Sequence, residues 1–188
     1  MTERSKIIAF AGRKRSGKGM LAKGMREYSP NVVIIAVADS LKLLCCKLLK
    51  ITYDELTQMK DDGTTFEAKV DDYWVSTIKH EVKISDNIIR NEIGGRVFTN
   101  VREVLQIIGT DLIRKYSPDW HIDKTIERIN SYGDDKIIAI DDVRFPNEKR
   151  KIEEIGGDDY FMIRPNYWDV SNHTSETSLK YTDICNSR

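Results

Sequence analysis

Short runs of consecutive apolar residues alternate with helical patterns along this chain of 188 residues, and this alternation constrains the fold more than any other feature. Each run is apolar at successive positions, which is typical of a strand buried on both faces of a parallel sheet. We predict four such strands, at residues 7–11, 31–39, 136–143 and 160–165, and a fifth that begins at 181–185. Because both faces of such strands must be covered, the sequence predicts an α/β fold with a parallel sheet covered by helices on both faces.

Capping residues and prolines mark the helices between these strands. Thr52 with Glu55 predicts a capping box at the start of one helix. Asn100 with Glu103 predicts a second helix start, and Ser40 is expected to cap the helix that follows the second strand. The predicted helices cover residues 21–28, 41–49, 101–116, 120–129 and 146–155.

A chain of this length is enough for one well-buried domain, with little room for a second core. The pattern weakens from about residue 58 to 99, where acidic, basic and aromatic residues are mixed around Gly94 and Gly95. We interpret this segment as an excursion from the core, a helix with a hairpin, rather than an independent domain. The sequence therefore predicts a single domain over residues 1–188.

A glycine-rich loop, in the segment FAGRKRSGKGML, joins the first predicted strand to the first predicted helix. The spacing Gly12-x-x-x-x-Gly17-Lys18 favours a phosphate-binding loop, because glycines let backbone N–H groups converge on phosphate oxygens. The helix N-terminus adds positive charge, and Lys18 can reach the terminal phosphates. The residues expected to contact ATP are Gly12, Arg13, Lys14, Arg15, Ser16, Gly17, Lys18 and Gly19. The alternative is an ordinary turn that carries basic residues.

The two residues after Lys18 lack the hydroxyl group that commonly helps such a loop to hold Mg²⁺, because they are Gly19 and Met20. Nucleotide phosphates, water and a carboxylate must then hold the ion. Asp141 and Asp142 come at the end of a predicted buried strand, where a carboxylate can orient magnesium or its water shell. The alternative is a solvated acidic turn.

The predicted helix over residues 101–116 has a polar row on one side. Arg102, Gln106, Thr110 and Arg114 are each four residues apart, which places them along one face of an α-helix. Two arginines beside an amide and a hydroxyl suit a substrate that carries a phosphate and a hydrogen-bonding base. The alternative is an ordinary exposed face.

The composition disfavours several kinds of partner. Lys plus Arg and Asp plus Glu both number 30, so the net charge is zero and a nucleic acid is not expected. The three cysteines have no metal-binding spacing and are expected to be reduced. The longest apolar run is too short to span a bilayer, and residues 2–4 do not begin a signal peptide. We expect a cytoplasmic protein that acts on a small molecule.

Several motifs resemble those of phage-type deoxynucleoside monophosphate kinases, of the P-loop kinase superfamily. They are FTNVREVLQIIGTDLIRKYSPDW, IIAIDDVRFPNE, IRP and HTSETSL, in the order seen in that family, together with ADSLK, which ends at Lys42. The residues that match the family pattern are Arg102, Leu105, Gln106, Gly109, Thr110, Asp111, Arg114, Asp142, Val143, Arg144, Phe145, Asn147, Glu148, His173, Ser175 and Glu176. The likeness covers most of the chain except residues 58–96.

The resemblance implies a P-loop kinase fold and transfer of the ATP γ-phosphoryl group to a deoxynucleoside 5′-monophosphate, with ATP and Mg²⁺ as cofactors. The expected catalytic residues are Lys18, Arg144 and Asp142, and Asp142 is also the expected metal ligand. The expected substrate-binding residues are Asp39, Lys42, Arg102, Gln106, Arg114 and Trp120. Residues 58–99 would form a cap over the substrate, and residues 164–178 a lid, with Arg164 and Asn186 contacting ATP. The resemblance is compatible with a homodimer, and a phage-encoded chain would act in the host-cell cytoplasm.

Other functions stay open because the chain departs from the family at Met20, which replaces a hydroxyl residue, and in its closing segment YTDICNSR. One alternative is a regulatory protein that binds a nucleotide without turnover. Another is a related small-molecule kinase that resembles dephospho-coenzyme A kinase or phosphomevalonate kinase. For Trp120, a place in the hydrophobic core is the alternative to stacking on a base.

Overall fold

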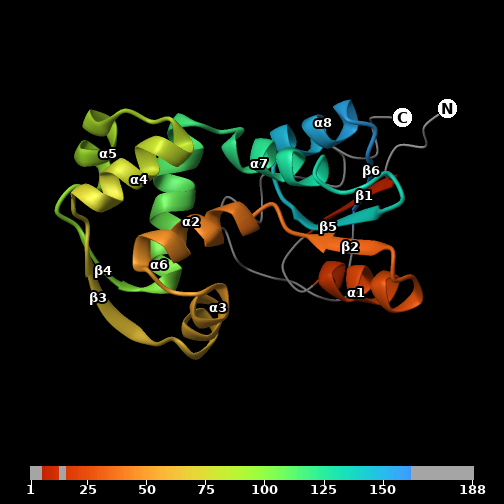
Figure 1. The fold of residues 1–188 in the computed structure, drawn as a ribbon, viewed down its shortest axis with the longest axis horizontal. Coiled ribbons are helices and arrows are strands. Elements are labelled where there is room, and N and C mark those ends of the chain that lie inside the picture. Colours follow the sequence, from red (N-terminus) through yellow and green to blue (C-terminus); the bar gives the residue numbers. More distant parts are fainter. Residues whose placement is uncertain (1–5, 13–15, 162–188) are drawn as a thin grey trace. The chain divides into compact units, whose positions relative to one another are not determined.

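The computed structural model describes residues 6–12 and 16–161. The chain forms two compact units (Figure 1). The first contains the described residues up to Val37 and from Ile122 onward, and the second runs from Ala38 to His121. The segment 58–99, predicted as an excursion, lies wholly within the second unit.

A four-stranded parallel sheet forms the centre of the first unit (Figure 1). Its strands, in spatial order, are β2 (Val32–Ile35), β5 (Ile137–Val143), β1 (Lys6–Ala11) and β6 (Asp158–Phe161). Four predicted strands are thus present, but β2 is shorter than the predicted range 31–39, and of the strand predicted at 160–165 only residues 160 and 161 are described, in β6, which begins at Asp158. The chain turns after Ile35, and Asp39 already belongs to the next helix. The predicted strand at 181–185 lies outside the described residues.

Helices cover both faces of this sheet, as predicted. They are α1 (Lys18–Tyr28) on one face, and α7 (Trp120–Ile129) and α8 (Pro146–Glu154) on the other (Figure 1). Successive residues of a strand point to opposite faces. Accordingly, Ile7 of β1 packs in one cluster with Ile122 of α7 and Ile152 of α8, whereas Phe10 packs in a separate cluster with Ala22 of α1. The first unit is therefore an α/β structure with a parallel sheet between helices.

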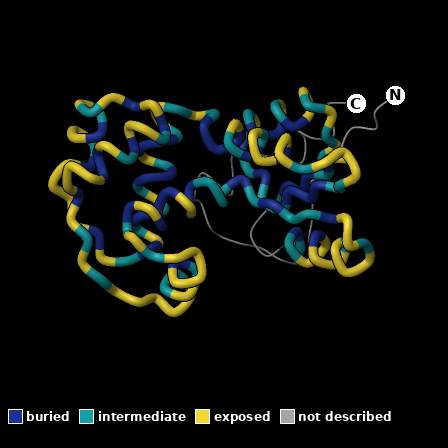
Figure 2. Tube along the Cα trace, in the orientation of Figure 1, coloured by how far each residue is buried: buried dark blue, intermediate teal, exposed yellow. Residues whose placement is uncertain are grey.

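The second unit has its own hydrophobic core, and the buried residues of its helices are dark blue in Figure 2. Its elements are α2 (Asp39–Leu49), α3 (Tyr53–Asp62), β3 (Thr65–Lys69), α4 (Asp72–Val82), α5 (Asp86–Ile93), β4 (Val97–Asn100), α6 (Val101–Gln106) and η1 (Ile107–Arg114). Strands β3 and β4 pair in an antiparallel manner. The expected helix and paired strands are present, but α4 and α5 separate the two strands along the chain, so they form no hairpin.

Two of the three predicted helix caps are confirmed. Thr52 and Glu55 form the capping box of α3, with the Glu55 carboxylate accepting a hydrogen bond of 2.7 Å from the Thr52 N–H. The Asn100 side chain accepts a hydrogen bond of 2.9 Å from the Glu103 N–H at the start of α6. The Ser40 cap is wrong, because α2 begins one residue earlier, at Asp39, and Ser40 lies inside the helix.

The helix predicted over residues 101–116 is continuous, but η1 consists of wider π-helical turns. Gly109 lies in η1, where a Cβ atom would be only 2.3 Å from Leu41 Cδ2 of α2. The absence of a side chain at this position therefore permits the close approach of η1 to α2. Such π-helical segments are rare and are frequent at functional sites.

Candidate functional site

At the described ends of the glycine-rich loop between β1 and α1, the backbone takes conformations that favour glycine. Gly12 and Gly17 have φ angles of 135° and 103°, a region that residues with a Cβ atom rarely adopt. Gly17 is the N-cap residue of α1, and among the described residues no side chain caps it. The first turn of α1 also contains no acidic residue. A helix start without an acidic residue in its first turn favours an anion, because the N-terminal end of the helix dipole is positive.

The Lys18 side chain lies back against this loop. It is only 6% exposed, and its Nζ atom donates hydrogen bonds to the Gly12 carbonyl oxygen (2.5 Å) and to Ser16 Oγ (3.4 Å). The ammonium group is therefore held beside the loop backbone, close to the α1 N-terminus. Arg13, Lys14 and Arg15, which were predicted to contact ATP, lie outside the described residues.

Asp141 and Asp142 lie at an irregularity in the pairing of β5 with β1. Ala9 pairs with Ile140 and Ala11 pairs with Val143, so two aspartates stand opposite the single residue between Ala9 and Ala11. Bulges of this kind re-aim side chains and are frequent next to active sites. The two carboxylates consequently have different surroundings.

Asp142 Oδ1 accepts a hydrogen bond of 2.6 Å from the Val37 N–H, which ties this carboxylate to the backbone after β2. Asp141 Oδ2 lies 3.5 Å from the point that a Cβ atom of residue 19 would occupy. Asp141 is thus the carboxylate beside the first turn of α1. The family resemblance implied Asp142 as the metal ligand; the pairing irregularity that gives the two aspartates different surroundings is not visible in the sequence.

The loop and the aspartates meet where the order of the sheet reverses. From β1 the chain continues to β2 on one side, and from β5 it continues to β6 on the other, although β1 and β5 are neighbours. Ligands of open α/β sheets bind outside the carboxyl ends of strands at such a switch point. Arg144 follows β5 directly, and its backbone N–H donates a hydrogen bond of 2.9 Å to the buried Glu148 carboxylate at the start of α8.

In the second unit, Tyr53 forms hydrogen bonds with both Asp39 and Lys42, although it was not among the predicted site residues. Lys42 Nζ lies 3.1 Å from Asp39 Oδ1 and 2.9 Å from Tyr53 Oη, and Tyr53 Oη donates a hydrogen bond of 2.9 Å to Asp39 Oδ1. Burial lowers the pKa of Lys42, but the hydrogen bond with Tyr53 and the charge of Asp39 outweigh it, so this pKa is raised. Lys42 is therefore held as a cation.

The predicted polar row on helix 101–116 divides into two parts. Arg102 and Gln106 are exposed on α6, and Arg102 Nε donates a hydrogen bond of 3.1 Å to the Lys60 carbonyl oxygen. Thr110 and Arg114 are half-buried in η1. The four-residue spacing follows one face only when the turns are α-helical, and the wider turns of η1 break this relation.

Trp120, predicted to stack on a base, is instead a core residue. It is 7% exposed, belongs to the hydrophobic core of the second unit, and donates a hydrogen bond of 3.0 Å from Nε1 to the Glu81 carbonyl oxygen.

The neighbouring residue His121 is also buried, and His121 Nε2 lies 3.3 Å from the Gly109 carbonyl oxygen. Because a carbonyl oxygen can only accept, Nε2 is the donor.

His121 should make the protein less stable in acid. Burial, and then the charge of Arg114, lower its pKa from the ordinary histidine value of about 6.5 to about 4. The unfolded state therefore binds the proton more tightly, and stability falls as pH drops through 6.5 toward 4. We expect His121→Gln to reduce the loss of unfolding free energy between pH 7 and 4.5 by roughly 2 kcal/mol. Urea unfolding at these pH values measures this, and identical pH profiles would contradict it.

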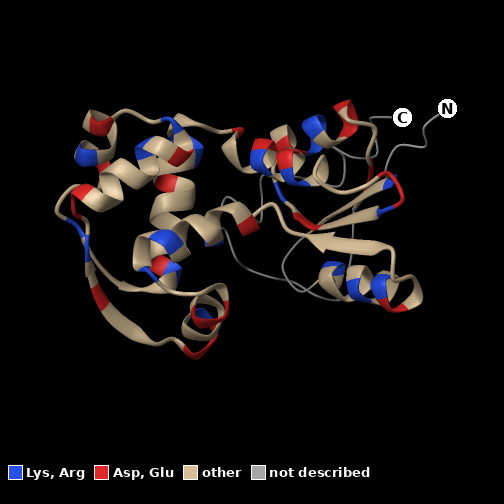
Figure 3. Cartoon of the chain, viewed as in Figure 1, with Lys and Arg blue, Asp and Glu red and all other residues tan. Residues whose placement is uncertain are grey.

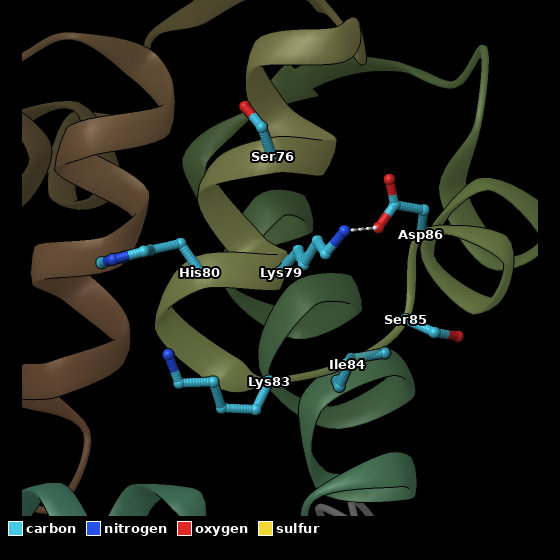
Figure 4. Close-up of a pocket in the computed structure, with 7 residues that line it drawn as sticks. All are labelled: Ser76, Lys79, His80, Lys83, Ile84, Ser85 and Asp86. Carbon is cyan, nitrogen blue, oxygen red and sulfur yellow. Dashed lines mark ion pairs between the residues drawn. The ribbon is translucent and has the colours of Figure 1, made fainter.

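A pocket with a volume of about 600 Å³ lies at the end of α4, and none of the predicted site residues lines it. In Figure 4, Lys79 points toward Asp86, with which it forms an ion pair of 2.8 Å, whereas His80 and Lys83 point to the other side of α4. Basic residues in the last turn of a helix interact favourably with its C-terminal dipole. The helix end by itself accounts for this positive charge.

Charged side chains of both signs are interspersed along the helices of each unit (Figure 3). Within residues 6–12 and 16–161, no three His, Cys, Asp or Glu residues are grouped so that they could hold a metal ion by themselves. No helix in the same residues is long and apolar enough to cross a bilayer. Arg164, Asn186 and the predicted lid at 164–178 lie outside the part of the chain described.

Comparison with known proteins finds neither a protein-family model nor a curated protein sequence that matches this chain.

Proposed function

We propose that this protein transfers the γ-phosphoryl group of ATP to a deoxynucleoside 5′-monophosphate. The observation that carries the proposal is the loop after β1. There the positive-φ backbone at Gly12 and Gly17, the start of α1 with no acidic residue in its first turn, and the ammonium group of Lys18 lie together. A site of this kind suits a polyphosphate. The acceptor class rests on the motifs shared with deoxynucleoside monophosphate kinases, and the expected site of action is the cytoplasm.

In this proposal, the main-chain N–H groups of the loop orient the phosphates of ATP. Lys18 stabilises the negative charge that spreads over the transferring group, and does so without reorganisation because the loop already positions its ammonium group. Arg144, which follows β5 at the same sheet edge, would supply a second cation. Catalysis would then depend on positioning and electrostatics, as is general for phosphoryl transfer.

The residues present fit a magnesium ion that arrives with the nucleotide. Mg²⁺ is commonly held by one or two carboxylates together with substrate phosphates and water, so a complete protein cage is not needed. Asp141 is better placed than Asp142 to hold it, because Asp141 lies beside the first turn of α1 while Asp142 binds the Val37 N–H. When bound, the metal would neutralise charge on the phosphate oxygens.

The second unit would supply the residues for the acceptor. Lys42 is held as a cation by Asp39 and Tyr53, and Arg102 is exposed on α6. His121 lies near Arg114, and its lowered pKa keeps the imidazole ring neutral at neutral pH. The ring therefore adds no positive charge beside Arg114. These cations suit the phosphate of a monophosphate acceptor.

An acceptor panel tests the function directly. The purified protein is given ATP and magnesium with each of the four deoxynucleoside monophosphates, and ADP formation is measured against a reaction without acceptor. Matched ribonucleotides, dephospho-coenzyme A and phosphomevalonate complete the panel. We expect the strongest stimulation of ADP formation in the whole panel to come from one of the deoxynucleoside monophosphates. Stimulation by none of the deoxynucleotides would rule the function out, and stronger stimulation by one of the last two acceptors would replace it.

A second candidate is a nucleotide-binding protein without turnover. It is favoured by the start of α1, where Gly19 has no side chain and Met20 is 78% exposed, so neither residue offers a hydroxyl group to a metal ion. This candidate predicts saturable ATP binding in calorimetry without ADP formation for any acceptor.

A further inference from the structure

The start of α3 is fixed so that Tyr53 faces α2. Tyr53 is the first residue of α3, directly after the N-cap residue Thr52. The capping box between Thr52 and Glu55 satisfies N–H groups on both sides of Tyr53. A local sequence signal thus determines the position at which the Tyr53 side chain leaves the backbone.

From this position, the Tyr53 hydroxyl group closes a triangle with two residues of α2. It accepts a hydrogen bond from Lys42 Nζ at 2.9 Å and donates one to Asp39 Oδ1 at 2.9 Å. The Lys42 ammonium group also lies 5.3 Å from the centroid of the Tyr53 ring, within the range of a cation–π contact. One tyrosine therefore restrains Lys42 through both its oxygen and its ring.

This arrangement leaves Lys42 able to bind an anion. An ammonium group has three N–H donors, and among the described residues Asp39 and Tyr53 take two of them. The Lys42 side chain is 23% exposed, so the third donor can reach a ligand. The negative charge of Asp39 would repel a phosphate, but Asp39 Oδ1 accepts hydrogen bonds from both Lys42 Nζ and Tyr53 Oη, which reduce this repulsion.

We propose that Tyr53 is a positioning residue that presents Lys42 to the phosphate monoester of the acceptor and screens that phosphate from Asp39. This inference rests on the proposed function and deepens it, because it assigns the acceptor phosphate to a place on α2. Without the hydroxyl group, Lys42 loses a restraint and Asp39 loses a donor, and both changes weaken the binding of an anion.

The test is Tyr53→Phe, which retains the ring and removes only the hydroxyl group. We expect the KM for the deoxynucleotide acceptor to rise about tenfold, while kcat and the KM for ATP change by less than about threefold. Lys42→Met should raise the acceptor KM at least as much. The double variant should be no worse than Lys42→Met, because residues that act through one another are not additive.

Tyr73→Phe is the matched control, because the Tyr73 hydroxyl group also makes a hydrogen bond, to the Lys47 carbonyl oxygen at 2.9 Å, and its ring lies 4.8 Å from Lys50 Nζ. It should leave both KM values unchanged. A merely structural role for Tyr53 would lower the active fraction, and hence the apparent kcat, without a change in KM. An unchanged acceptor KM in an active Tyr53→Phe protein overturns this inference alone. Absence of transfer by the wild type to every deoxynucleotide overturns the proposed function and the role of Tyr53 with it.

Discussion

Replacing Lys18 by Met is expected to lower acceptor-dependent ADP formation by about 10²- to 10³-fold, the effect typical of removing one preorganised charge from a transition state. The ammonium group of Lys18 is buried against the loop, where it donates a hydrogen bond to the Gly12 carbonyl oxygen. A methionine side chain occupies similar space, so the loop should keep its shape while it loses the charge. Steady-state kinetics with the best acceptor measures the loss, and calorimetry measures the accompanying loss of ATP affinity.

Lys23→Met is the control for Lys18, because Lys23 is an exposed lysine of the same helix, α1. It should leave activity within about threefold of the wild type, as expected for an exposed charge. Thermal unfolding of both variants must show intact folding. If Lys18→Met retained activity close to that of Lys23→Met, the glycine-rich loop would not be the ATP site.

Replacing Arg144 by Ala is expected to lower kcat by about 10³-fold with only a modest change in ATP affinity, because a cation that acts on the transferring group matters most in the transition state. Arg144 is half-buried after β5, and its backbone N–H is held by Glu148 at the start of α8. Truncation of its side chain leaves this backbone contact in place. Single-turnover kinetics together with ATP calorimetry separates the two effects.

The matched control for Arg144 is Arg150→Ala, at an exposed position of α8 whose side chain lies 3.6 Å from Glu154. This variant should retain wild-type kcat, since exposed ion pairs contribute little. Unchanged turnover in Arg144→Ala would refute its role in transfer. A loss of ATP affinity with unchanged kcat would place Arg144 in ground-state binding instead.

Features that depend on neighbours in the chain could be predicted from the sequence. The strand Lys6–Ala11 and the helix Lys18–Tyr28 form as expected, with Gly12 and Gly17 at positive φ between them, because an apolar run and residues permissive of positive φ are local properties. The capping residues Thr52 and Asn100 are likewise recognised from residues three positions away. The helix end before Ser117 follows from the proline beside it.

Features that depend on distant segments could not be predicted in this way. The strand order that brings β1 beside β5 arises from packing between segments more than 100 residues apart along the chain. The pairing irregularity that gives Asp141 and Asp142 different surroundings exists only once these two strands pair. The contact of Tyr53 with Lys42 likewise requires α3 to pack against α2.

The sequence by itself therefore determined that a strand and a helix flank the glycine-rich loop and that α3 and α6 begin after Thr52 and Asn100, because short-range sterics and hydrogen bonding decide these. The tertiary structure alone decided which aspartate lies beside the glycine loop, that Trp120 is a core residue and that Tyr53 joins Lys42. Those outcomes depend on side-chain packing between distant segments, which sequence spacing does not encode.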